Sequence, residues 1–139
     1  MPNLTRATAP AAPGYGSAPP SGSLTGVDET IWQAVRAARG WLDEANGTGE
    51  AELTCRMLKL TEEAGEVAGA WIGLLGQNPR KGVTHTREDV AAELADAAFT
   101  ALVAIESLGL DARAALGRCA GKVTGRMDDR PAASGSAAD

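Results

Sequence analysis

Two short acidic segments have matching spacing and could together bind a divalent cation. The first is Glu62-Glu63-x-x-Glu66 and the second is Glu93-x-x-Asp96, thirty positions further along the chain. Carboxylates three residues apart on an α-helix lie on the same side of it, so each segment offers a pair of oxygen ligands. Such hard ligands suit Mg²⁺ or Mn²⁺. The pairs can act together only if the elements that carry them pack side by side.

Helical periodicity identifies those elements. Apolar residues recur at alternating spacings of three and four in four segments, which are residues 28–45, 50–75, 87–108 and 111–128. Asp28 and Asp111 are predicted N-caps, and Thr86 with Asp89 has the spacing of a capping box. Short connections between amphipathic helices predict an all-α fold, a four-helix bundle.

The acidic pairs lie on the flanks of the predicted apolar stripes. On the second helix, Glu63 and Glu66 follow one flank of a stripe that includes Trp71, which is predicted to be core. A shift of thirty positions places Glu93 and Asp96 in the same relation to the stripe of the third helix. An antiparallel hairpin of these helices would bring the four carboxylates into one cleft. The alternative is a solvated helix face, which is the commoner reason for such spacing.

Composition limits the other possibilities. The chain of 139 residues carries 18 acidic and 13 basic residues, a net charge of −5, so nonspecific nucleic-acid binding is not expected. Cys55 and Cys119 form no CxxC pair and are predicted to be reduced, buried thiols. The longest uncharged apolar run, residues 67–76, is too short for a membrane span, and no signal peptide is recognisable at the N-terminus. A cytoplasmic protein without a membrane partner is expected.

The ends of the chain differ from its centre. Residues 1–26 and 131–139 are rich in Pro, Ala, Gly and Ser and contain too few large apolar side chains to support a core. Both are predicted to be disordered tails around one helical domain at residues 27–130.

The acidic segments and their surroundings resemble a known family. Glu62-Glu63-x-x-Glu66 followed by Glu93-x-x-Asp96 is similar to the EExxE…ExxD signature of the MazG-like, all-α nucleoside triphosphate pyrophosphohydrolases. The longer stretch "KLTEEAGEVAGAWIGLLGQNPRKGVTHTREDVAAELADAAFTALVAI" resembles the single-module MazG-like proteins of actinobacteria. The similarity covers residues 28–130.

This resemblance implies a helical bundle that forms a homodimer or a dimer of dimers. It implies Mg²⁺, with Mn²⁺ as an alternative, held by Glu63, Glu66, Glu93 and Asp96. It also implies cleavage of a nucleoside triphosphate to the monophosphate and pyrophosphate. The residues that select the base in better-defined relatives have no secure counterparts in this sequence, so the base and the sugar are left open.

Other residues are candidates for contacts with the substrate. Lys59 is one turn before Glu63 and could reach a phosphate, or form an ion pair within its own helix. Lys122 and Arg126 belong to a basic stripe on the fourth helix, which could face the acidic cleft or be a solvated surface. Trp41 is a candidate for contact with the base, with a place in a protein interface as the alternative. Glu62 has no counterpart on the third helix and is predicted either to orient water or to lie on a solvated surface. Glu62 and Glu63 are the candidate catalytic residues.

The sequence therefore predicts a Mg²⁺-dependent nucleotide pyrophosphohydrolase. Because the sequence contains no GxxxxGK[ST] loop, a P-loop ATPase is not supported. The alternative is a noncatalytic bundle that binds metal through the same acidic pairs and acts as a regulatory or interaction module.

Overall fold

The computed structural model describes residues 24–128, which form four α-helices. They are α1 (Leu24–Asn46), α2 (Glu50–Leu74), α3 (Arg87–Ser107) and α4 (Ala112–Asp128). The prediction of an all-α bundle of four helices is confirmed. The predicted tails lie outside the described residues, apart from residues 24–26, which belong to α1.

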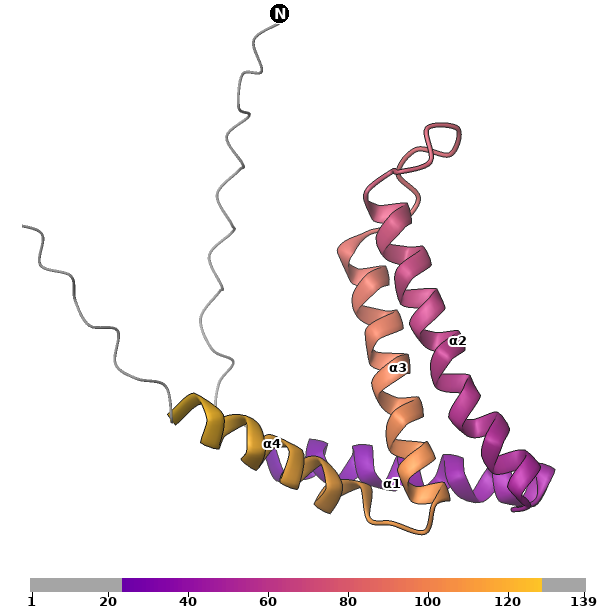
Figure 1. Cartoon of the computed structure of the whole chain (residues 1–139), viewed down its shortest axis with the longest axis vertical. Coiled ribbons are helices and arrows are strands. Elements are labelled where there is room, and N and C mark those ends of the chain that lie inside the picture. Colours follow the sequence, from indigo (N-terminus) through magenta and orange to yellow (C-terminus); the bar gives the residue numbers. More distant parts are fainter. Residues whose placement is uncertain (1–23, 129–139) are drawn as a thin grey trace, which may run out of the picture.

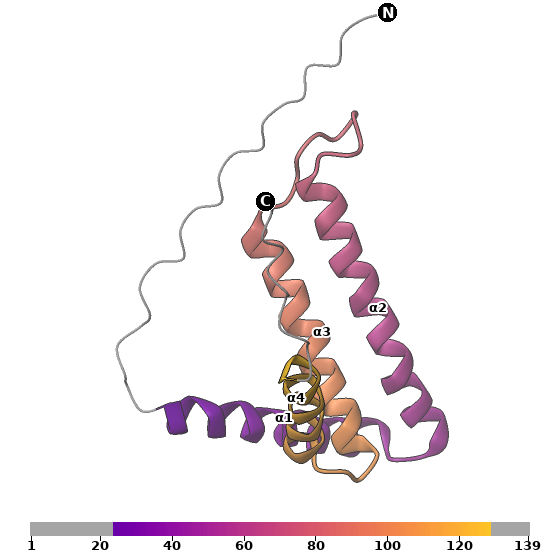
Figure 2. The ribbon, with the colours of Figure 1, turned by 60° about the vertical axis from the view of Figure 1, so that its left-hand side comes forward.

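The centre of the fold is an antiparallel hairpin of α2 and α3 (Figure 1). Helix α1 crosses the end of this hairpin that is opposite the loop between α2 and α3, and both views show this crossing (Figures 1 and 2). Helix α4 begins at the same end and extends away from the hairpin (Figure 1). Helix α3 is the common partner, because it packs against α1, α2 and α4.

Local sequence signals explain where the helices begin and end. The predicted capping box before α3 is present: the Thr86 hydroxyl accepts a hydrogen bond from the Asp89 amide at 3.1 Å, and the Thr86 amide donates to the Asp89 carboxylate at 2.8 Å. Asp111 caps α4 by accepting from the amide of Ala114 at 2.8 Å. The prediction for Asp28 is wrong, because α1 begins four residues earlier, at Leu24.

The core of the single chain is small, and the predicted apolar stripes are only partly covered. The buried apolar side chains in the described part of the chain are Trp32, Val35, Ala70, Val90, Val103, Ala104 and Ala112. Trp71 was predicted to be core, yet 47% of its surface is exposed. The seam of α2 against α3 runs instead through Arg56, Glu63 and Ala70, seven residues apart, so the stripe faces partly outward.

The cysteines also differ from the prediction. Cys55 on α2 and Cys119 on α4 are both exposed, and neither forms a disulfide. Cys55 lies outside the apolar stripe of α2. Together with Arg56 and residues of α1, it lines a cavity on the α1 side of the hairpin.

A buried arginine joins three of the helices. Arg56 on α2 is 6% exposed and donates to Asp43 of α1 at 2.7 Å and to Glu52 at 3.0 Å. It also donates to the hydroxyl of Ser107 at the end of α3 and to the carbonyl of Gly47, both at 3.0 Å. These hydrogen bonds fix the open end of the hairpin, opposite the loop between α2 and α3, against α1.

Candidate metal centre

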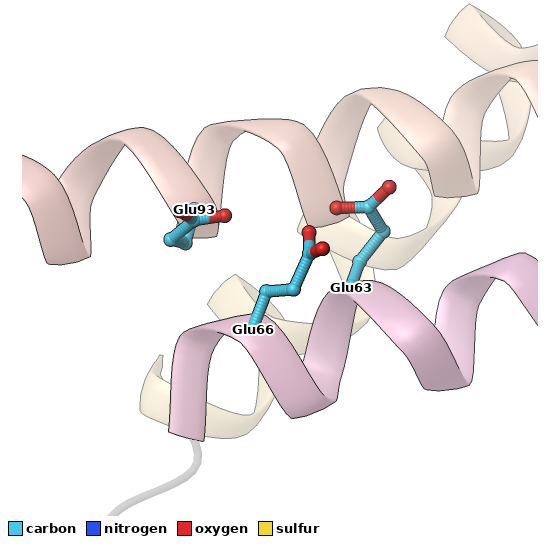
Figure 3. Close-up of side chains that lie close together, drawn as sticks. All are labelled: Glu63, Glu66 and Glu93. Carbon is cyan, nitrogen blue, oxygen red and sulfur yellow. The ribbon is translucent and has the colours of Figure 1, made fainter. Parts of the chain in front are cut away.

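Three of the predicted ligands meet between α2 and α3. Glu63 and Glu66 project from α2 and Glu93 projects from α3 into the space between the helices (Figure 3). One carboxylate oxygen from each residue lies within 4.8 Å of the others. Oxygens on opposite sides of a Mg²⁺ ion with ligand distances of about 2.1 Å are roughly 4.2 Å apart, so a group of this size could hold a small divalent cation once its oxygens close around it.

The antiparallel register of the hairpin brings these residues together. Glu63 lies on the seam that α2 presents to α3, and Glu66 is on the next turn of the same flank. Small residues on both sides of the seam, Ala70 at 2% exposure and Ala104 at 6%, let the two helices approach closely. As a result, Glu93 on α3 comes close to Glu63 and Glu66 of α2.

The cluster differs in solvent access from one carboxylate to the next. Only 8% of the Glu63 side chain is exposed, whereas Glu66 is exposed and Glu93 is half-buried. The negative charge of Glu63 raises the pKa of Glu66 above its ordinary value, with smaller contributions from burial and from Glu93. A cation between the carboxylates would relieve this repulsion.

A lysine of α2 already neutralises part of the cluster. The Lys59 ammonium lies 2.9 Å from the Glu62 carboxylate and 2.9 Å from the Glu63 carboxylate. Hydrogen bonds to these two acids raise the pKa of Lys59. Of the two interpretations of Lys59 from sequence, the ion pair within the helix is the one present in this structure.

The remaining predicted site residues lie outside the cluster. Asp96 is exposed on α3 and its carboxylate does not join the three-residue group. Glu62 points to solvent, with 61% of its side chain exposed. Lys122 and Arg126 are exposed on α4, which extends away from the hairpin (Figure 1), and no ion pair within residues 24–128 joins them to a carboxylate.

A cavity lies next to the cluster, at the crossing of α1 with the hairpin. Its volume is about 360 Å³, and Lys59 and Arg56 line it together with Trp41, which is 67% exposed. The other lining residues are Ala38, Leu42, Asn46, Glu52, Cys55, Phe99, Thr100, Val103 and Ala104. Lys59 therefore lies between this mainly apolar cavity and the carboxylates.

Sequence reasoning missed two parts of this arrangement. Arg56 was not predicted to be buried, because arginine is normally a surface residue, and its partner Asp43 is on another helix. Phe99 and Thr100 line the cavity from α3, but a single aromatic residue and a threonine give no signal in the sequence.

No family model, curated protein or solved structure shows a significant match to the chain. Within residues 24–128, no helix combines the length and the apolar character needed to cross a membrane.

Proposed function

We propose that this protein is a divalent-metal-dependent nucleotide pyrophosphohydrolase that converts a nucleoside triphosphate to the monophosphate and pyrophosphate. The observation that carries the proposal is the convergence of Glu63, Glu66 and Glu93 from two adjacent helices to within 4.8 Å. Carboxylates in this arrangement suit Mg²⁺ or Mn²⁺, which neutralise phosphate charge and activate water. The resemblance of both acidic segments to the MazG-like signature supports the same reaction.

The protein side chains have distinct roles in this proposal. Glu63, Glu66 and Glu93 would hold the cation. Asp96, one turn further along α3, would be the fourth ligand. Glu62 is exposed beside the cluster, where it can orient the attacking water.

Contacts with the substrate come from the surroundings of the cluster. Lys59 neutralises a phosphate, because it lies between the carboxylates and the cavity. The base enters the cavity beside Trp41, whose exposed ring is available for stacking. Lys122 and Arg126, which are exposed on α4, would contact the outer phosphates.

The exposed apolar residues support a homodimer, or a dimer of dimers, as the working form. Met57, Leu60 and Trp71 of α2 and Leu94 of α3 are 37%, 39%, 47% and 54% exposed, and we call them the apolar face. In an antiparallel pair, equal rotations away from the seam lead to the same side, so these residues share one side of the hairpin. Large exposed apolar patches are typical of protein interfaces. Sedimentation velocity should show a dimer that Leu94→Glu dissociates.

A nucleotide panel tests the proposed reaction. The purified protein would be incubated with Mg²⁺ and each common or modified nucleoside triphosphate, and the products separated by ion-exchange chromatography. A monophosphate and pyrophosphate are expected, and Glu93→Gln should remove turnover, since the cation loses a ligand. Glu88→Gln, an exposed change on the same helix, is the matched control and should retain activity. Release of orthophosphate with a diphosphate would overturn the proposed mechanism.

A noncatalytic metal-binding module is the second candidate. It is favoured by the position of Asp96 outside the cluster and by the direction of α4, the helix that carries Lys122 and Arg126 and extends away from the hairpin (Figure 1). Metal binding without release of any product, across the whole panel, would support this candidate.

A further inference from the structure

The ammonium of Lys59 forms an ion pair with the carboxylate of Glu63, which is one of the groups that the cation would need as a ligand. It lies 2.9 Å from Oε1 of Glu63 and 2.9 Å from Oε2 of Glu62. Glu63 is the most buried member of the carboxylate cluster, with 8% of its side chain exposed, so water neutralises it poorly. The lysine is therefore the internal counter-ion of a carboxylate that would otherwise be both charged and buried.

A divalent cation and this ammonium compete for the same group. A cation coordinated by Glu63 withdraws electron density from its carboxylate and repels a positive charge a few ångströms away. Lys59 has another partner available, because Glu62 lies outside the cluster and 61% of its side chain is exposed. Release of Glu63 therefore leaves the ammonium paired rather than isolated.

We propose that Lys59 is an exchangeable counter-ion: it holds Glu63 in the metal-free protein, moves to Glu62 alone when the cation binds, and thereby sets the cation concentration at which the site fills. The proposal rests on the metal site of the proposed function. It gives Glu62 and Lys59 a role before any nucleotide binds, which is separate from their roles towards a substrate.

The chain provides suitable controls for this exchange. It contains three lysines, and Lys81 lies exposed in the loop after α2 without an ion pair in the described part of the structure. Lys81→Met therefore removes the same charge without removing the contact. Lys59→Arg keeps both the charge and the ability to pair with Glu63.

Titration with Mn²⁺ tests the proposal in the absence of nucleotide, with free Mn²⁺ followed by electron paramagnetic resonance. Lys59→Met should lower the Kd by about fivefold or more, because a positive charge next to a divalent ion is removed. Lys59→Arg and Lys81→Met should stay within about twofold of the parent, since neither frees Glu63. An unchanged or higher Kd for Lys59→Met overturns the exchange while leaving the metal site intact. Absence of Mn²⁺ binding by the parent overturns the metal site and the exchange with it.

Thermal unfolding of the same variants separates exchange from a merely structural role. Without metal, Lys59→Met should melt below the parent, because Glu63 loses its counter-ion. With saturating Mn²⁺, the rise in Tm should be larger in Lys59→Met than in the parent, because metal binding no longer displaces a lysine. A lysine with only a structural role would lower the Tm by the same amount in both conditions, and that result would overturn the proposal.

Discussion

The strongest effect on stability is expected from Arg56→Met, which removes the guanidinium that joins α1, α2 and α3. Its four hydrogen bonds go to two carboxylates, a hydroxyl and a backbone carbonyl. Methionine fills much of the same volume, so the loss comes mainly from the polar groups that remain without their partner.

The magnitude follows from how well the remaining groups are solvated. Removal of one member of a buried ion pair typically costs 3–5 kcal/mol, and we expect about 3 kcal/mol here, at the lower end of that range. Two features favour the lower end. The side chain of Asp43 keeps 20% of its surface exposed, and it retains an ion pair with Arg39 at 2.7 Å.

Urea denaturation at a fixed protein concentration, followed by circular dichroism at 222 nm, measures this difference. A loss of about 3 kcal/mol corresponds to a fall in Tm of about 10 °C or more for a domain of this size. Arg118→Met on α4 is the control, because Arg118 is exposed and has no ion pair in the described chain, and it should change the free energy of unfolding little. A loss below about 1 kcal/mol for Arg56→Met would refute the view that this junction holds the three helices together.

Three further predictions concern the carboxylates and the glycines. Glu66→Gln should slightly raise the Tm of the metal-free protein, because Glu63 raises the pKa of Glu66 and the charge of Glu66 therefore opposes folding. The same variant should abolish the rise in Tm on adding Mn²⁺, and melting curves with and without metal check both results. The pKa of Glu52 is lowered below its ordinary value of 4.5 by hydrogen bonds, so its stabilisation is present above that pH and is lost as the pH falls through the lower pKa; the gap in Tm between the parent and Glu52→Gln should close on acidification. Gly73→Ala should destabilise the fold by about 1–2 kcal/mol, because the added methyl group meets the loop before α3, where the amide of Thr84 donates a hydrogen bond to the Gly73 carbonyl at 3.0 Å. Gly69→Ala has open space around it and should stabilise the fold by about 0.5–1 kcal/mol. Urea titrations can test both changes.

Local signals in the sequence were enough to predict the helices, but not the direction in which each one faces. Thr86 and Asp111 marked their helix starts correctly, because a capping side chain bonds to amides within its own turn. The stripe through Trp71 was predicted to be the core from periodicity alone, yet the seam with α3 follows Glu63 and Ala70. Periodicity cannot distinguish a stripe that packs within the chain from one that is left for another molecule.

The candidate site was predictable to the extent that it depends on one hairpin. The thirty-residue shift places Glu63 and Glu93 on corresponding flanks of their helices, and the antiparallel packing of α2 against α3 brings these two residues together with Glu66. Contacts outside the α2–α3 hairpin, which involve α1 and α4, were not predictable. The position of Lys122 depends on the direction in which α4 leaves the hairpin, and no local motif in the sequence specifies that direction.

The weak packing of α4 has a consequence for how the molecule opens. In the described chain this helix has α3 as its main neighbour, and nearly all of its side chains are exposed. Its backbone amides should therefore exchange with deuterium through local unfolding, at rates much faster than those of α2 and α3. Any molecule that covers α4 would slow this exchange. If a second copy does so, the protection of α4 will rise with protein concentration while that of the hairpin core stays nearly constant.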